Sequence, residues 1–307
     1  MFRNSIAFIF PGQGSQYVGM GSDLYEEFGE VRKTFEEASD LLKFDLKKVC
    51  FEGPEEELRR TSIAQPAILT LSIAIWRLLP SIQAKYLAGH SLGEYTSLVA
   101  GGVIKFEDAV RLVRKRGELM EGMKKGKMVA ILRFPREELE KILTAWEGRC
   151  VIANYNSPQQ IVISGEEEAV DRVVKEAEGK GARCVELAVS GAFHSPLMLE
   201  ANEKFIKELD KVHFKDSVIP IVSNVLAKPL LKGEEIKETL KRQMVSPVLW
   251  EDCVQVMGSE VEWFVEVGPG KVLSNLVKRI LPHAKAINIE NKESLGKFLE
   301  EFGKEVE

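Results

Sequence analysis

The sequence predicts an α/β fold in which helices cover a mostly parallel sheet and a small ferredoxin-like unit interrupts the larger pattern. Three observations lead to this prediction. Short apolar runs alternate with helix-like segments through most of the 307 residues. Residues 126–190 follow a different order of elements. A Gly-x-Ser-x-Gly sequence lies between one apolar run and the helix-like segment after it, where a sharp strand-to-helix turn is expected.

The first 125 residues alternate between strand-like and helix-like segments. Buried strands are expected at Ile6–Phe10 and Lys85–Ala88, which are short and apolar. Helices are expected over Ser22–Asp40, Gln65–Leu79, Ser91–Ala100 and Glu107–Met120, from the spacing of their apolar residues. Ser22 is the expected N-cap of the first helix, and Pro66 is tolerated in the first turn of the second.

Residues 126–190 carry the interrupting unit. Strands are expected at Met128–Arg133, Val151–Tyr155, Gln160–Ser164 and Arg183–Val189, and helices at Arg136–Trp146 and Glu166–Glu178. This β-α-β-β-α-β order is that of the split βαβ, or ferredoxin-like, unit. We therefore interpret residues 126–190 as a small subdomain inserted into a large domain made of residues 1–125 and 191–307.

The C-terminal part returns to the first pattern. Helices are expected at Pro196–Leu209, Glu234–Met244, Trp250–Met257 and Lys271–Ile280, and strands at Pro220–Ser223 and Trp263–Val267. Ligands of parallel sheets bind at the carboxyl ends of the strands. A site is therefore expected where the loops after Ile6–Phe10 and Lys85–Ala88 meet.

The composition excludes several classes of function. With 42 basic and 47 acidic residues the formal net charge is −5, so neither nucleic acid nor a membrane is an expected partner. The longest apolar segment, Ile63–Leu79, contains Gln65, Pro66 and Arg77 and is typical of a buried helix. The N-terminal apolar run is too short for a signal peptide, and the four cysteines show no Cys-x-x-Cys or zinc-like spacing. A cytoplasmic protein with free thiols is expected.

The segment Gly89-His90-Ser91-Leu92-Gly93 is the most informative motif. Glycines two residues either side of Ser91 remove side chains that would clash in a strained turn, and the following helix directs its N–H groups at the reacting centre. This arrangement is that of a nucleophile in an α/β-hydrolase-like domain. The alternative is a tight turn in which Ser91 only caps the helix.

A serine nucleophile needs a base, and the chain has four histidines. The side chain of His90 should diverge from its neighbour Ser91, and His213 and His283 lie in segments expected to be solvated or near a helix end. His194 lies in a loop of small residues between a strand and a helix, which makes it the candidate base. A loop histidine satisfied by its surroundings is the alternative.

Two further features suggest substrate contacts. Arg116 shares one helical face with Leu112, Val113 and Met120, and a buried arginine is costly unless it meets a carboxylate. That carboxylate belongs either to a substrate or to a structural salt bridge. The glycine-rich segment 11–16 fits neither the dinucleotide pattern nor the P-loop, and it is able to supply a backbone N–H to an oxyanion.

Five motifs occur in one order and together resemble a known family. They are Phe10-Pro11-Gly12-Gln13-Gly14-Ser15-Gln16, Gly89-His90-Ser91-Leu92-Gly93-Glu94-Tyr95, Arg116-Gly117, Phe193-His194-Ser195 and Glu266-Val267-Gly268-Pro269-Gly270-Lys271-Val272-Leu273. They closely resemble the malonyl-CoA:acyl carrier protein transacylases, which load malonyl groups for type II fatty acid synthesis. The resemblance covers essentially the whole chain, and five ordered motifs are far more specific than any one of them.

The resemblance implies a serine–histidine pair in place of a full triad. By position, Ser91 is the nucleophile, His194 the base, and Gln243 the residue whose carbonyl orients the histidine. The backbone N–H groups of Gln13 and Leu92 match the donors of the family's oxyanion hole.

The resemblance also implies a substrate. Arg116 matches the arginine that binds the malonyl carboxylate with two parallel hydrogen bonds. Three further positions that match the surroundings of the pocket are Gln65, Met120 and Asn154. Leu92 after the serine and Phe193 before the histidine resemble the malonyl-selective type of related acyltransferases, since Phe193 leaves little room for an α-methyl branch.

The expected partners are malonyl-CoA and holo acyl carrier protein, the expected mechanism is ping-pong, and neither cofactor nor metal is expected; we expect a monomer. A serine hydrolase would need an acid between Ser91 and His194 in the sequence, where the aspartates are Asp108 and Asp171, both expected on exposed helix positions. A non-catalytic subunit that docks acyl carrier protein is the other alternative, and the intact set of Ser91, His194 and Arg116 disfavours it.

Overall fold

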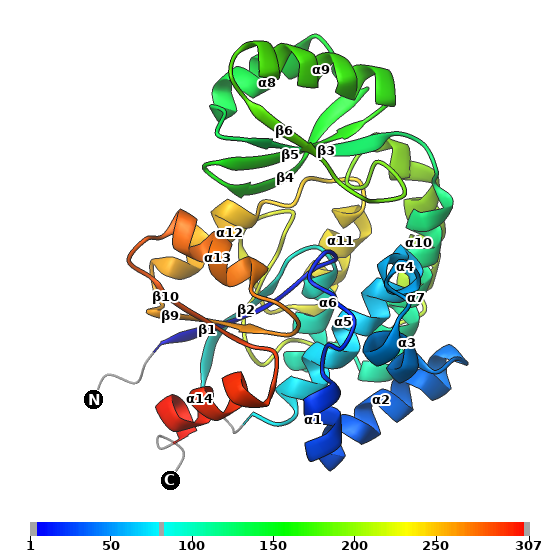
Figure 1. Ribbon diagram of the computed structural model, residues 1–307, viewed down its shortest axis with the longest axis vertical. Helices are drawn as coiled ribbons and strands as arrows, with labels where there is room; N and C mark the ends of the chain where they lie inside the picture. The colour runs from blue at the N-terminus through cyan, green and yellow to red at the C-terminus, as the bar shows by residue number, and fades with distance from the viewer. Residues whose placement is uncertain (1–4, 80–82, 304–307) are drawn as a thin grey trace.

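The computed structural model describes residues 5–79 and 83–303 and contains two sheets (Figure 1). The larger sheet has the strand order β10-β9-β1-β2-β7-β8. Its strands are β1 (Ile6–Phe10), β2 (Ala84–Gly89), β7 (Ile221–Val222), β8 (Pro229–Leu230), β9 (Trp263–Val267) and β10 (Lys285–Ile289). Neighbouring strands pair in parallel except β7 and β8, which are antiparallel. The predicted mostly parallel sheet is confirmed.

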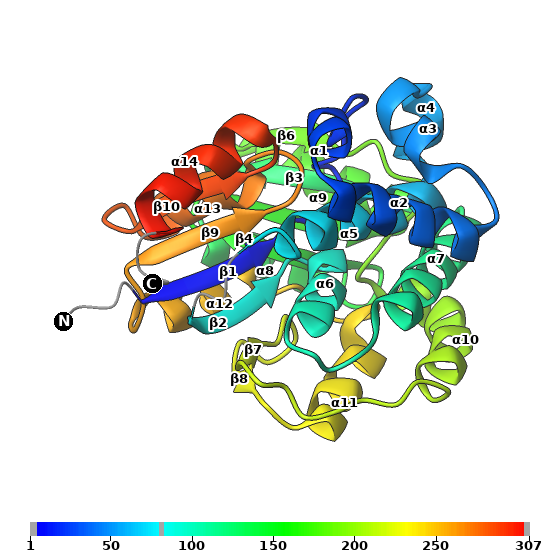
Figure 2. The ribbon, with the colours of Figure 1, turned by 90° about the horizontal axis from the view of Figure 1, so that it is seen from below.

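Side chains that alternate along β1 enter two separate cores. Ile6, Phe8 and Phe10 pack with α2 (Gly29–Leu42), α5 (Thr61–Trp76), α6 (Leu92–Ala100), α7 (Phe106–Gly122) and α14 (Lys292–Phe302). Ala7 and Ile9 pack with α12 (Trp250–Gly258) and α13 (Val272–Ile280) on the other face. Figure 2 shows α14, α5 and α6 on the near side of the sheet and α12 and α13 behind it. Both faces are covered, as expected for buried parallel strands.

The smaller sheet lies above the larger one in Figure 1. Its strands are β3 (Lys127–Leu132), β4 (Cys150–Ser157), β5 (Gln160–Gly165) and β6 (Arg183–Glu186), and its helices are α8 (Arg136–Thr144) and α9 (Glu167–Gly179). The strand order β4-β5-β3-β6, with antiparallel neighbours, is the ferredoxin-like order. Val129 and Ile131 pack beneath α8 and α9, whereas Met128 and Ala130 point into the main core. The open face of this sheet therefore closes over the larger unit.

The remaining described helices are α1 (Ser22–Glu27), α3 (Leu46–Glu52), α4 (Glu55–Arg59), η1 (Pro196–Met198), α10 (Leu199–Leu209) and α11 (Gly233–Gln243). The single helix expected over Ser22–Asp40 is wrong, because the backbone of Phe28 is extended and separates α1 from α2. The N-cap of α1 is Gly21 rather than Ser22, whose hydroxyl donates to the carbonyl of Gly19.

Helix α5 begins at Thr61, four residues earlier than expected, so Pro66 lies beyond its first turn. Proline has no N–H for the carbonyl four residues before it. Arg114 Nη1 donates instead to that carbonyl, on Ser62, at 2.8 Å. No helix in the described ranges is long and apolar enough to cross a membrane.

Candidate functional site

Ser91 lies in the sharp turn between β2 and α6, with φ 50° and ψ −101°. The two flanking glycines have no room for a side chain. A Cβ on Gly89 would lie 1.9 Å from the carbonyl carbon of Gly93, and a Cβ on Gly93 would lie 2.0 Å from the carbonyl oxygen of Phe10. Glycine is therefore required at position 89, where the end of β2 meets the first turn of α6, and at position 93, where α6 meets the end of β1. This turn presents Ser91 at the carboxyl end of the sheet.

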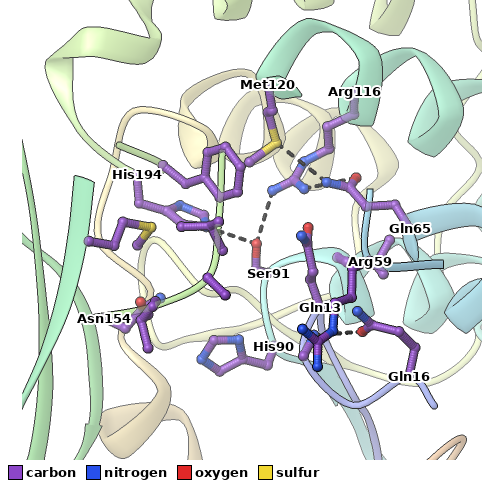
Figure 3. Close-up of a pocket in the computed structure, with 17 residues that line it drawn as sticks. Gln13, Gln16, Arg59, Gln65, His90, Ser91, Arg116, Met120, Asn154 and His194 are labelled. Atoms are coloured by element: carbon purple, nitrogen blue, oxygen red, sulfur yellow. Dashed lines mark hydrogen bonds between the residues drawn. The ribbon is translucent and has the colours of Figure 1, made fainter. Parts of the chain in front are cut away.

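His194 is the base candidate that the fold brings to Ser91. Its Nε2 lies 2.8 Å from Ser91 Oγ, although 103 residues separate the two in the chain (Figure 3). Its Nδ1 faces two backbone carbonyl oxygens, of Gln243 at 2.9 Å and Ser246 at 3.1 Å. Because carbonyls only accept, the proton lies on Nδ1 and the bare Nε2 is left to accept from the serine hydroxyl.

The His194 side chain is held neutral. Burial, together with the nearby positive charge of Arg116, lowers its pKa to about 3. Both Ser91 and His194 also have positive φ, at 50° and 55°, a region that non-glycine residues seldom adopt and that is concentrated at functional sites. The two side chains thus meet on strained backbone that the surrounding fold holds in place.

Arg116 is buried on α7, with 1% of its surface exposed, as its position in the helical pattern predicts. Its Nη1 donates to Gln65 Oε1 at 3.0 Å, and its Nη2 donates to Ser91 Oγ at 3.0 Å and Gln243 Oε1 at 3.1 Å. Its Nε is buried without a partner among the described residues. The structural salt bridge considered for Arg116 is absent from the described part of the chain, where all three of its acceptors are neutral oxygens.

The side chain of Gln243 makes contacts that the sequence did not predict. Its Nε2 donates to Glu94 Oε2 at 2.7 Å and to the carbonyl of Ser91 at 3.0 Å. Asn224 was also missed; its Oδ1 accepts from the backbone N–H of Ser91 at 2.7 Å, and its Nδ2 donates to the carbonyl of Gly89 at 2.7 Å. The sequence held one signal for these contacts: Glu94 is a charged residue in the otherwise uncharged segment 92–100.

A cavity of about 350 Å³ opens beside Ser91, between the two sheets. Expected site residues that line it are Gln13, Gln65, Ser91, Leu92, Arg116, Met120, Asn154, Phe193 and His194. Gln243 lies behind this wall and contacts the lining groups. Arg59, Gln16 and the segment 187–189 also line the cavity and were not predicted. The backbone N–H groups of Gln13 and Leu92 donate no hydrogen bond within the described residues, whereas the Gln13 side chain donates to Thr61 Oγ1 at 3.1 Å.

The geometry disfavours a serine hydrolase with an acidic third member. Both acceptors at His194 Nδ1 are backbone carbonyls. Asp171, one of the two aspartates considered for that role, is exposed on α9 and pairs with Lys127. A neutral carbonyl fixes the tautomer of the imidazole but stabilises an imidazolium less than a carboxylate does.

Comparison with known proteins places the chain in a family. Residues 7–306 match the family model described as acyl transferase domain. The chain is 44% identical over 302 residues to the malonyl CoA-acyl carrier protein transacylase of Bacillus subtilis (strain 168), with 95% of each chain covered. It is 42% identical over 306 residues to the protein of that name from Escherichia coli (strain K12), covering 96% of this chain and 98% of the other.

Solved structures agree with these relatives. An acyl carrier protein S-malonyltransferase from Vibrio cholerae O1 superposes with a TM-score of 0.92 at 41% identity, covering 95% of this chain and 99% of that chain. A malonyl-transacylase in complex with its type II PKS acyl-carrier protein superposes with a TM-score of 0.94 at 40% identity, covering 97% and 99%. Ser91, His194 and Arg116 line one cavity, and the chain matches these relatives over nearly its whole length. The chain therefore belongs to the acyl transferase domain family, among the malonyl CoA-acyl carrier protein transacylases.

Proposed function

We propose that this protein transfers malonyl groups from malonyl-CoA to the phosphopantetheine thiol of holo acyl carrier protein, through a malonyl ester on Ser91, for fatty acid synthesis. The observation that carries the proposal is that Ser91 Oγ contacts both His194 Nε2 at 2.8 Å and Arg116 Nη2 at 3.0 Å. One group supplies a base and the other a buried cation. A nucleophile with both neighbours suits an acyl chain that ends in a carboxylate.

In the first half-reaction, His194 Nε2 takes the proton of the Ser91 hydroxyl as the oxygen attacks the thioester carbonyl of malonyl-CoA. The negative charge that develops on the carbonyl oxygen is stabilised by the backbone N–H groups of Gln13 and Leu92, each such donor contributing about 2.7–4 kcal/mol. The C–S bond then breaks, the proton passes from His194 to the leaving CoA sulfur, and the malonyl ester remains on Ser91.

In the second half-reaction, the phosphopantetheine thiol attacks the ester carbonyl and gives its proton to His194. The same N–H groups stabilise the second oxyanion. The C–O bond to Ser91 breaks, the serine oxygen regains the proton, and malonyl-acyl carrier protein leaves. The carbonyl groups behind His194 Nδ1 keep the imidazole in the tautomer that both steps need.

Arg116 selects the acyl group by binding its carboxylate. Before substrate arrives, the guanidinium is bonded only to neutral oxygens, and Nε has no partner among the described residues. A carboxylate would replace weak acceptors with a charge-assisted pair. Phe193, which lines the cavity next to His194, disfavours an α-methyl branch. Gln65, Met120 and Asn154 complete the walls around the acyl group.

The division into a large domain of residues 1–125 and 191–307 and a small domain of residues 126–190 is part of this proposal, although residues 1–4, 80–82 and 304–307 lie outside the described residues. It is supported by the separate packing of Val129 and Ile131 beneath α8 and α9. We also propose that the reaction needs no cofactor, because base, oxyanion donors and carboxylate partner all come from the chain, and that it takes place in the cytoplasm.

The test is to incubate the protein with labelled malonyl-CoA and locate the label by peptide mass spectrometry. The label should lie on the peptide that contains Ser91 and should leave it when holo acyl carrier protein is added. Ser91→Ala serves as the control that abolishes labelling. A wild-type protein that releases malonate without forming a transferable ester would instead be a hydrolase, and a protein that never labels would be neither.

A further inference from the structure

Glu94 is a buried carboxylate close to Ser91 that the proposed reaction does not use. It is 1% exposed and lies in the first turn of α6. Its Oε2 accepts a hydrogen bond of 2.7 Å from Gln243 Nε2 and a longer one of 3.4 Å from the backbone N–H of Asn224. Burying a carboxylate is costly unless a donor or cation compensates for the lost water. The position of Glu94 therefore calls for a cationic partner.

The side-chain amide of Gln243 connects Glu94 with Arg116. Because the amide nitrogen donates to Glu94 and to the Ser91 carbonyl, the amide oxygen is turned toward Arg116 Nη2, 3.1 Å away. Arg116 and Glu94 are thus a buried cation and a buried anion separated by one neutral amide. The anion acts on the arginine without contacting it, so Nε of the guanidinium keeps no partner among the described residues and the neutral acceptors of the other two nitrogens can be replaced by a second carboxylate.

We propose that Glu94 is the counter-ion of Arg116 in the unloaded enzyme, acting through the Gln243 amide, and that it limits how tightly the site holds the carboxylate of its substrate. This inference rests on the proposed function, because it assigns the acyl carboxylate to Arg116. Glu94 is a positioning residue, since it acts through Arg116. It stabilises the empty site, and it opposes the incoming carboxylate because like charges repel across a poorly solvated interior.

The ionisable groups around Glu94 allow the effect to be followed by pH. Burial raises the pKa of Glu94 to about 7, against the opposing effects of the hydrogen bonds from Gln243 and Asn224 and of the Arg116 charge. Tyr95 on the same helix and Cys253 on α12 have pKa values raised by burial, so both stay neutral. The pKa of His194 is lowered to about 3. As the pH falls below about 7, Glu94 therefore loses its charge while Tyr95, Cys253 and His194 stay neutral, and the substrate carboxylate should bind more tightly.

The experiment compares wild type with Glu94→Gln, which removes the charge and keeps an oxygen for Gln243. Ser91 is acylated in single-turnover reactions with malonyl-CoA or with acetyl-CoA, and the mass of the intact protein reports the extent of acylation. The dependence of the rate on substrate concentration separates the apparent Kd from the loading rate constant. At pH 8.5, where Glu94 is charged in the wild type, the Kd for malonyl-CoA relative to that for acetyl-CoA should fall roughly tenfold in Glu94→Gln. The loading rate constant should change little, and the melting temperature should fall, because the empty arginine has lost its counter-ion.

Glu266 provides a matched control. It is another fully buried glutamate whose pKa is raised to about 7, but its carboxylate accepts the backbone N–H groups of Leu273 and Ser274 at the start of α13. Glu266→Gln should lower stability and leave the ratio of malonyl to acetyl Kd unchanged. A ratio altered equally by both variants would mean that loss of any buried charge disturbs the site, and would overturn the proposal.

A ratio in Glu94→Gln that stays within twofold of wild type, or that rises, would also overturn the proposal. If this variant does not fold, the wild-type pH series decides. The ratio of malonyl to acetyl Kd should fall as the pH is lowered from 8.5 to 5.5, and a flat or rising ratio contradicts the proposal. Titration of the CoA phosphates cancels, because both substrates carry them. A wild type that never forms the malonyl ester contradicts the proposed function instead.

Discussion

The hydroxyl of Ser91 accepts a hydrogen bond of 3.0 Å from Arg116 Nη2, so the proposed nucleophile and the proposed carboxylate-binding group are in contact before any substrate is bound. The guanidinium favours the developing serine alkoxide, but its charge also disfavours the imidazolium that His194 must become. A substrate carboxylate on Arg116 would offset that charge. The acyl group that fits the pocket should therefore also make the base easier to protonate.

Arg116→Ala should reduce malonyl loading about 100-fold or more, because charge-assisted hydrogen bonds contribute about 1.5–3 kcal/mol each and this pair would lose two. Acetyl loading should persist or rise, since removing the positive charge raises the pKa of His194. The measurement is the rate of Ser91 acylation by each CoA ester. Arg111→Ala, an exposed arginine on the same helix, is the control. Equal losses for malonyl and acetyl would assign Arg116 a structural role.

The buried neutral His194 should make the protein less stable in acid. Its folded pKa of about 3 lies below the ordinary value of 6.5, so the unfolded chain binds the extra proton between these values. The contribution of neutral His194 to the free energy of unfolding is fully present above pH 6.5 and is lost as the pH falls toward 3. Between pH 7.5 and 5.0, denaturant unfolding should show wild type losing about 2 kcal/mol more than His194→Asn. Equal losses of stability in the two proteins would contradict the lowered pKa of His194.

His194→Asn should also slow the acylation of Ser91 by malonyl-CoA about 10²–10⁴-fold, because the variant lacks the base.

Phe193→Ser should relax the choice of acyl group. The phenyl ring is 6% exposed and lines the cavity beside the base, so its removal opens space next to the α-carbon of the acyl group. One methyl group changes discrimination by about 1–3 kcal/mol, so methylmalonyl loading relative to malonyl loading should rise about tenfold. Phe214→Ser, which removes an equally buried ring outside the cavity lining, should lower stability without changing this ratio. An unchanged ratio in Phe193→Ser would place the methyl discrimination elsewhere.

Gly89→Ala should prevent the turn around Ser91 from forming. Its Cβ would lie 1.9 Å from the backbone of Gly93, and backbone atoms cannot move aside as a flexible side chain can. Unfolding measurements should show a loss of about 3 kcal/mol or a failure to fold. Gly122→Ala, at the end of α7 with nothing within 4 Å of its Cβ, should change stability by less than about 1 kcal/mol. A stable Gly89→Ala protein would contradict the close approach.

Local pattern was enough to predict the main strands, the ferredoxin-like insertion and the Ser91 turn. The spacing of apolar residues distinguishes the strand β1 from the helix α5. The steric need for glycine at position 89 arises within five residues, from the backbone of Gly93 and Glu94. The edge strand β10 was missed because its sequence, Lys-Ala-Ile-Asn-Ile, is only partly buried and gives no clear alternation. The break at Phe28 was missed because apolar spacing continues across it, although the backbone there is extended.

The sequence by itself determined which residue types meet: a serine flanked by glycines, a histidine in a loop of small residues, and an arginine on an apolar helix face. Only the tertiary structure decided how they are connected. The carbonyls at His194 Nδ1, the Asn224 amide at the Ser91 turn and the chain from Glu94 through Gln243 to Arg116 join segments up to 149 residues apart. Such hydrogen bonds depend on ångström-scale positions that packing sets, and no periodicity in a chain records them.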